Sequence, residues 1–226
     1  MESLRINKYI DHTVLKPETT KDQVLQVCEE AVQNNFASVC VNSCYTAIVT
    51  KALKGSSVKS CTVIGFPLGA NSTECKVFEA RDAILNGASE LDMVLNVGAL
   101  KARDLEYVEG DIAAVVNISK GRAIVKVILE TCLLTNEEII QACNISYNAG
   151  AQYVKSSTGF NSAGAMKEHI ILMHQTVGKY IGVKASGGIR TYEKALLMIN
   201  AGASRIGTSS SVKIIQEQDK YLDNNT

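Results

Sequence analysis

The sequence contains no tryptophan and only two prolines among its 226 residues, and aromatic residues make up 5%. With so little proline there is no proline-rich linker, so nothing in the composition marks a boundary between domains. The chain also lacks a surplus of charge, because 23 lysines and arginines match 23 aspartates and glutamates. That balance argues against a general affinity for nucleic acid or for an anionic membrane.

Long apolar runs are missing as well. No stretch approaches the roughly 18 apolar residues of a membrane span. The first residues, MESLRINKYIDH, lack the basic end and apolar stretch of a secretory signal. We therefore expect a cytosolic protein that binds no membrane and no nucleic acid.

The motifs of dedicated metal sites are absent. The seven cysteines are scattered without a C-x-x-C pair, and the three histidines form no H-E-x-x-H motif. We expect reduced thiols and no bound metal. The chemistry must then come from organic side chains.

What the chain does contain is a regular alternation of short β-branched runs and helix-length amphipathic segments, many of which end in glycine. The runs cover residues 9–15, 37–42, 59–66, 90–97, 122–130, 151–157, 180–186 and 204–209. Eight such units predict an α/β protein, a single (β/α)8 barrel domain over residues 1–226 with a short polar tail from about 217. An open doubly wound sheet is the alternative.

Three lysines stand in three successive expected strands. Lys126, Lys155 and Lys184 each follow a valine in an apolar run, and each is 29 residues from the next. A single lysine on a strand usually lays its stem along apolar surface and keeps its ammonium in solvent. Three lysines at one repeat interval indicate a site instead.

Side-chain alternation sorts each strand into two faces. Asp92 lies opposite Leu91 and Met93, just as Lys126 lies opposite Val125. In a barrel, the apolar face packs on the helices, and we expect the charged face to point inward toward the carboxyl end, where such enzymes place catalytic groups. The same alternation puts on the inward face Asp11, Cys40, Lys155 and Lys184. Cys40 has a second interpretation, as a small core side chain.

Clustered ammoniums favour a neutral amine. A free lysine is almost fully protonated at neutral pH, but burial and neighbouring positive charge favour the nucleophilic form. We expect Schiff-base chemistry at Lys155, whose strand lies between those of the other two lysines. An imine needs an acid or base at carbon, for which Asp92 is the first candidate and Asp11 and Glu130 are alternatives. Asp92 could instead only orient a lysine, and Glu130 could form an internal ion pair with Lys126.

Glycine-rich turns follow the last two expected strands, in ASGGIRT and RIGTSSS. Backbone N–H groups at such strand-to-helix turns form the phosphate site that barrels commonly build after strands seven and eight. The turn STGF after the Lys155 strand adds two further residues. The expected substrate-binding set is Thr158, Gly159, Ser186, Gly187, Gly188, Gly207, Ser209 and Ser210.

Eight segments of the chain together resemble the deoxyribose-phosphate aldolase family. They are YIDHTVLKP, VCVN, VIGFPLGA, ELDMVLNVGAL, VKVILET, VKSSTGF, VKASGGIRT and RIGTSS, from about residue 8 to about residue 212. The resemblance implies a class I aldolase that reversibly cleaves 2-deoxy-D-ribose 5-phosphate into acetaldehyde and D-glyceraldehyde 3-phosphate. It implies no cofactor, a small phosphorylated sugar as the partner, and in many members a homodimer.

The resemblance also implies roles for single residues. Lys155 matches the Schiff-base lysine, Lys184 the second lysine that favours its neutral form, and Asp92 the proton-transfer carboxylate. The positions that match the lining of the family pocket are Asp11, Cys40 and Lys126. Two other functions fit the residues alone: a different phosphosugar barrel enzyme, such as an isomerase or another Schiff-base aldolase, and a non-catalytic sugar-phosphate-binding barrel.

Overall fold

Eight parallel strands close into a barrel in the computed structural model, which describes residues 5–223. Strand β1 pairs with β2 on one side and with β8 on the other, and this second pairing closes the ring. The (β/α)8 prediction is therefore confirmed, and the open doubly wound sheet is wrong. The strands are β1 (Ile10–Thr13), β2 (Ser38–Val41), β3 (Lys59–Ile64), β4 (Glu90–Val94), β5 (Ile124–Ile128), β6 (Tyr153–Lys155), β7 (Gly182–Ser186) and β8 (Arg205–Thr208).

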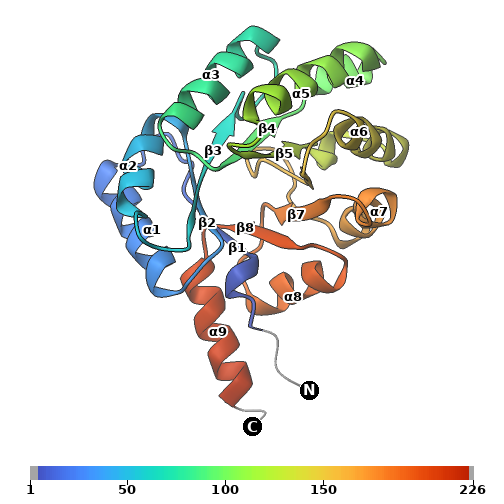
Figure 1. Cartoon of the computed structure of the whole chain (residues 1–226). Helices are drawn as coiled ribbons and strands as arrows, with labels where there is room; N and C mark the ends of the chain where they lie inside the picture. The colour runs from blue at the N-terminus through green and yellow to red at the C-terminus, as the bar shows by residue number, and fades with distance from the viewer. Residues whose placement is uncertain (1–4, 224–226) are drawn as a thin grey trace.

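Helices surround the barrel on its outside (Figure 1). Their bounds are α1 (Lys21–Gln33), α2 (Thr46–Ala52), α3 (Thr73–Leu85), α4 (Val97–Lys101), α5 (Leu105–Ser119), α6 (Asn136–Asn148), α7 (Lys167–Val177), α8 (Tyr192–Asn200) and α9 (Ser211–Asp223). The polar tail expected from about residue 217 is instead the end of α9 as far as Asp223. Ile214 and Ile215, which precede that expected tail in the same helix, pack into the core. The last three residues of that expected tail lie outside the described part of the chain.

Local sequence signals fix where several helices begin. Thr20 caps α1 by accepting from the Gln23 N–H, while the Gln23 side chain accepts from the Thr20 N–H. Thr135 and Glu138 form the same reciprocal pair at the start of α6. Each pair satisfies two backbone donors that a helix end would otherwise leave without a partner.

The two faces of the strands separate as the alternation predicts. The outward face joins the apolar core between barrel and helices, and the strand residues in this core include Val39, Val41, Leu91, Met93, Val125, Val127, Val154 and Val183. The inward face carries the charged side chains. The helix-facing core thus holds the barrel together and leaves its interior for polar groups.

The first and last described segments lie side by side at one edge of the molecule (Figure 1). The backbone N–H of Ile6 donates to Gln218 Oε1 at 2.8 Å, which ties the segment before β1 to α9. Within residues 5–223, no helix has the length and apolar character needed to cross a membrane.

Candidate active site

A hollow of about 390 Å³ opens at the carboxyl ends of the strands. Lys155, the expected nucleophile, lines it. Most of the residues expected to bind substrate line it too, namely Thr158, Gly159, Ser186, Gly187, Gly188, Gly207 and Ser209. Ser210 lies just outside this lining, where its N–H donates to Thr208 Oγ1 at 2.9 Å. The structure therefore places one of the three lysines together with the glycine-rich turns after β7 and β8.

Asp92 lies beneath this hollow and joins the three lysines. Its Oδ1 is 2.7 Å from Lys126 Nζ, and its Oδ2 is 2.8 Å from Lys155 Nζ and 2.7 Å from Lys184 Nζ. Since Lys155 and Lys184 contact the same oxygen, their ammonium groups are close neighbours. The strand register supports this contact, because Lys155 is directly opposite Lys184 and Asp92 is opposite Lys126.

Six of these inward side chains form a closed ring of alternating charge, which we call the ion ring. Its contacts run from Asp11 to Lys184 (2.5 Å), Lys184 to Asp92 (2.7 Å), Asp92 to Lys126 (2.7 Å), Lys126 to Glu90 (2.7 Å), Glu90 to Arg205 (2.6 Å) and Arg205 back to Asp11 (3.1 Å). All six residues are buried. Three carboxylates and three cations leave the ion ring without net charge, and such pairing is what makes buried charges tolerable.

The contacts of the ion ring favour the charged forms of Asp92, Asp11 and Lys184. Burial raises the pKa of the Asp92 carboxyl, but Lys126, Lys155 and Lys184 outweigh burial and hold this pKa well below its usual range. For Asp11, burial again acts upward, yet Lys184 and the other cations lower the pKa to about 2. Burial lowers the pKa of the Lys184 ammonium, whereas Asp11 and Asp92 outweigh it and raise this pKa above the usual value.

Three expected pocket residues lie deeper than the pocket. Asp11, Cys40 and Lys126 are fully buried and are absent from the lining of the hollow. Asp11 and Lys126 belong to the ion ring, whereas Cys40 packs in a small apolar cluster with Cys61 and Leu15. The expectation that the charged face opens toward the mouth thus holds for Lys155, while the other charges neutralise one another inside the barrel.

Glu130 does not pair with Lys126, so the ion pair considered from the sequence is wrong. Strand β5 ends at Ile128, and Glu130 adopts a left-handed backbone with φ of 57°. Its carboxylate accepts from the N–H and the hydroxyl of Thr158 and so holds the turn after β6. The alternation that holds within the strand no longer applies two residues beyond its end.

The structure adds four charged residues that the sequence reasoning missed. Lys16 and Arg190 line the hollow from the loops after β1 and β7, and Glu90 and Arg205 complete the ion ring. The alternation could have found the last two, because Glu90 lies two residues before Asp92 and Arg205 two before Gly207.

Gly207 is tightly confined beside the second lysine. A Cβ atom at this position would lie 2.9 Å from Ser186 Cβ and 3.0 Å from Lys184 Cε. Glycine therefore leaves room for the Lys184 stem, so this residue serves the lysine cluster in addition to lining the hollow.

One group in the barrel has the donor types of a metal site. The ligand atoms of Cys40, Cys61 and Asp92 lie within 4.8 Å of one another. The ammonium groups of Lys126 and Lys184 contact the same Asp92 carboxylate, however, and their positive charge opposes a metal cation there. The donor set therefore fits the ion ring better than it fits a metal ion.

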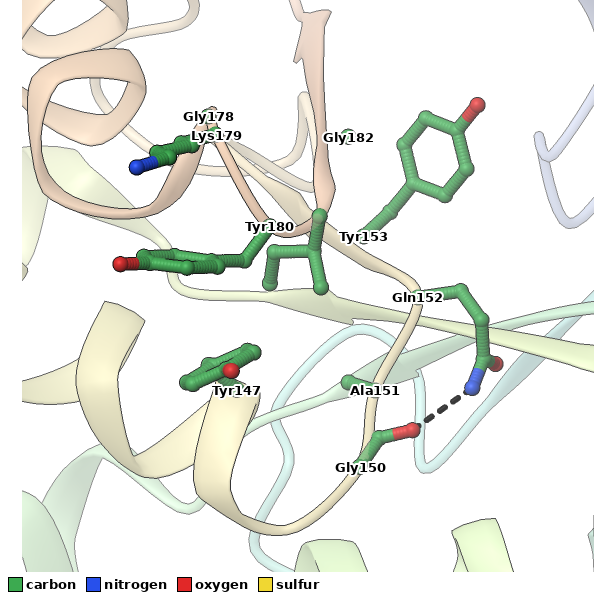
Figure 2. A pocket seen from close by; sticks show the side chains of 10 residues that line it. Tyr147, Gly150, Ala151, Gln152, Tyr153, Gly178, Lys179, Tyr180 and Gly182 are labelled. Carbon is green, nitrogen blue, oxygen red and sulfur yellow. Dashed lines mark hydrogen bonds between the residues drawn. The ribbon is translucent and has the colours of Figure 1, made fainter.

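A second hollow, of about 580 Å³, lies at the opposite end of the barrel, where β6 and β7 begin. Figure 2 shows the rings of Tyr147 and Tyr180 facing each other there, with Tyr153 on the other side of the strand. Among its lining residues, only Lys179 carries a charge. It offers no acid–base pair, so the hollow at the carboxyl end is the candidate active site.

The fold and the site define a class of protein: a (β/α)8 barrel with buried lysines beneath glycine-rich turns at its carboxyl end. Comparison with known proteins identifies its family. The model of the DeoC/LacD family aldolases matches residues 5–217, and the chain belongs to this family. It is an aldolase, a carbon–carbon lyase that acts on aldehydes.

Several relatives are similar over nearly their whole length. The deoxyribose-phosphate aldolase of Clostridium tetani is 59% identical over 95% of this chain and 99% of its own, and that of Bacillus cytotoxicus is 57% identical over 98% and 100%. The solved deoxyribose phosphate aldolase of Aeropyrum pernix, described as a unique tetramer, is 35% identical over 96% of this chain and 92% of its own, with a TM-score of 0.89.

Proposed function

We propose that this aldolase reversibly cleaves 2-deoxy-D-ribose 5-phosphate into acetaldehyde and D-glyceraldehyde 3-phosphate through a Schiff base on Lys155. One observation carries the proposal. Of the three clustered lysines, Lys155 is the one that lines the hollow, while Lys126 and Lys184 are sealed beneath it. The names of the relatives support the choice of substrate.

The chemistry follows from the position of that amine. The Lys155 amine adds to the aldehyde carbon, and loss of water gives an iminium ion. Deprotonation of the hydroxyl at C3 then breaks the C2–C3 bond, which releases glyceraldehyde 3-phosphate and leaves an enamine. Protonation of the enamine carbon and hydrolysis of the new iminium release acetaldehyde and restore the amine.

In these reaction steps, Asp92 acts mainly as a permanent negative charge. Its depressed pKa makes the protonated form scarce, so a stored proton is not its principal contribution. Its contact with Lys155 Nζ instead suits an anion that orients the amine and stabilises the positive iminium. This role agrees with the second interpretation of Asp92 from the sequence, in which the carboxylate orients a lysine.

The phosphate end of the substrate has a separate place in the hollow. The turns after β7 and β8 supply backbone N–H groups, and α9 begins at Ser211, directly after the second turn. Arg190, on the loop after β7, adds a positive charge to the same lining. These groups match the donors that bind a phosphate at the mouth of a barrel.

Trapping of the imine tests the proposal. Acetaldehyde and borohydride together should inactivate the enzyme permanently and add one reduced ethyl group to the peptide that contains Lys155, as measured by mass spectrometry. Lys155→Leu should be inactive and gain no adduct, whereas Lys126 and Lys184 should stay unmodified. Absence of an adduct at saturating aldehyde would refute the Schiff base and leave the non-catalytic barrel as the better explanation.

A further inference from the structure

Lys155 contacts the ion ring without belonging to it. Its single ion pair is with Asp92 Oδ2, an oxygen that Lys184 already contacts at 2.7 Å. The ion ring is complete and neutral before Lys155 is counted. An ammonium at Lys155 would therefore be an unmatched charge in a nearly sealed interior, whereas a neutral amine leaves the interior balanced.

Two members of the ion ring lie far from the hollow. Glu90 and Arg205 are the first residues of β4 and β8, so they sit at the amino end of the barrel, opposite the mouth. Arg205 Nη2 lies 2.6 Å from both carboxylate oxygens of Glu90. The guanidinium carbon of Arg205 lies 5.9 Å from the centre of the Tyr153 ring. Tyr153 also lines the second hollow (Figure 2).

We propose that Glu90 and Arg205 are positioning residues that set the protonation of Lys155 through the net charge of the ion ring. The inference rests on the proposed Schiff base at Lys155 and adds to it residues that touch no substrate. Glu90 fixes Lys126, and Arg205 fixes Asp11, at 2.7 and 3.1 Å. Those two neighbours in turn hold Asp92 and Lys184 against the nucleophile.

The charged and titratable groups that face Lys155 come from every side. Asp92 contacts it from β4, and Lys184 on β7 contacts the same Asp92 oxygen. Lys126 on β5 contacts the other oxygen of Asp92, and the Cys40 thiol on β2 lies within electrostatic range of Lys155. Lys16 and Arg190 share the lining of the hollow with it. Substitution of Glu90 or Arg205 removes none of these side chains, so a change in Lys155 chemistry has to pass through the ion ring.

Variants that change the charge of the ion ring in opposite directions should therefore move the acid limb of the pH profile of kcat/KM in opposite directions. Glu90→Gln leaves the ion ring with an extra positive charge, which disfavours the ammonium and moves the limb to lower pH. Arg205→Met leaves an extra negative charge, which favours the ammonium and moves the limb to higher pH. Each shift should be roughly one pH unit, the size expected for one charge acting across a protein interior.

Two controls separate charge from structural damage. Arg205→Lys keeps the charge and should leave the acid limb where the wild type has it. The double variant Glu90→Gln/Arg205→Met restores neutrality and should return the limb to that position even if kcat stays low. Circular dichroism of each variant checks that the barrel is folded.

Two outcomes would contradict the proposed role of Glu90 and Arg205. Limbs that move in the same direction, or a loss of kcat without any movement, would show that the two residues are structural only. Borohydride trapping on the same variants keeps the two proposals apart, because an adduct on Lys155 at alkaline pH preserves the Schiff base even when the profiles do not move.

Discussion

At the scale of the residue, His12 is a buried side chain of β1 that forms an ion pair with Glu30 when it is protonated. Its Nε2 lies 2.8 Å from Glu30 Oε2. Burial lowers the pKa of His12 below its usual value, even though Glu30 acts in the opposite direction. Folding therefore favours the neutral imidazole. The stability of the fold then depends on pH through a residue outside the candidate active site.

This linkage predicts that stability falls as the pH drops below about 6.5, the ordinary pKa of histidine. The unfolded chain then binds a proton at His12 that the folded chain does not bind. This difference lowers the free energy of unfolding by up to about 1.4 kcal/mol per pH unit. Urea unfolding at pH 7.5 and 5.5 should show a smaller loss in His12→Gln than in the wild type. His174→Gln, at an exposed position of α7, should behave as the wild type does. Equal losses in all three proteins would contradict the linkage.

The alternation of side chains along the strands predicted much of the candidate site from the sequence alone. It placed Asp92 and the lysines on one inward face, and the structure brings them together. It could not show that Arg205 reaches Glu90, because that contact joins residues 115 positions apart across the barrel. Its formation depends on side-chain length and barrel diameter rather than on the period of either strand.

At the scale of the element, one buried ion pair holds α3 to α5. Lys76 Nζ lies 2.5 Å from Asp111 Oδ2 and donates to the carbonyl oxygen of Val94 at 3.1 Å. Both side chains are almost inaccessible to solvent. Removal of one partner leaves a buried charge unpaired, which is far more costly than the loss of an exposed pair.

We therefore expect Lys76→Met to lower the free energy of unfolding by about 3–5 kcal/mol. Lys76→Met/Asp111→Leu should recover much of this loss, because neither charge then remains in the core. The exposed pair of Lys101 and Glu138, at 2.7 Å, is the matched comparison, and Lys101→Met should cost less than about 1 kcal/mol. Chemical denaturation measures all three variants, and similar losses for Lys76→Met and Lys101→Met would contradict the argument.

The boundaries of elements were less predictable than their order. All eight strands appear in the expected sequence, since β-branched runs separated by amphipathic segments carry that signal. The run 90–97 nevertheless ends early, because Asn96 caps α4 and Val97 already belongs to that helix. Such a switch depends on one side-chain hydrogen bond, which hydrophobic periodicity does not report.

At the scale of the whole molecule, the proposed function assigns the reacting carbon and the phosphate of the substrate to different parts of the hollow at the mouth of the barrel. Lys155 lines the hollow on one side, and Ser209 lines it beside the start of α9. We therefore expect the binding energy of the phosphate to help position the aldehyde at the Lys155 amine.

Ser209→Asp should place a negative charge where we expect the phosphate. It should raise KM for 2-deoxyribose 5-phosphate by roughly tenfold or more, since about 1.4 kcal/mol of repulsion already gives that factor. KM for unphosphorylated 2-deoxyribose should change little. Ser209→Asn, which has nearly the same shape without charge, is the control. Equal effects of Ser209→Asp on both sugars would place the phosphate elsewhere.

The assembly of the molecule and its location in the cytoplasm stay predictions from the sequence. The solved relative from Aeropyrum pernix is described as a tetramer, whereas the resemblance noted in the sequence allows a homodimer. Light scattering of the purified chain distinguishes these states.

The ion ring also has a consequence for how the chain folds. Its contact between Asp11 and Arg205 spans 194 positions, from the first strand to the last. Loop closure over such a distance comes late, after local helices and neighbouring strand pairs have formed. We therefore expect a half-built barrel to present Lys155 without the complete ion ring beside it. On the proposed function, this amine becomes competent only when the first and last strands meet, so the recovery of activity on refolding should follow the closure of the barrel.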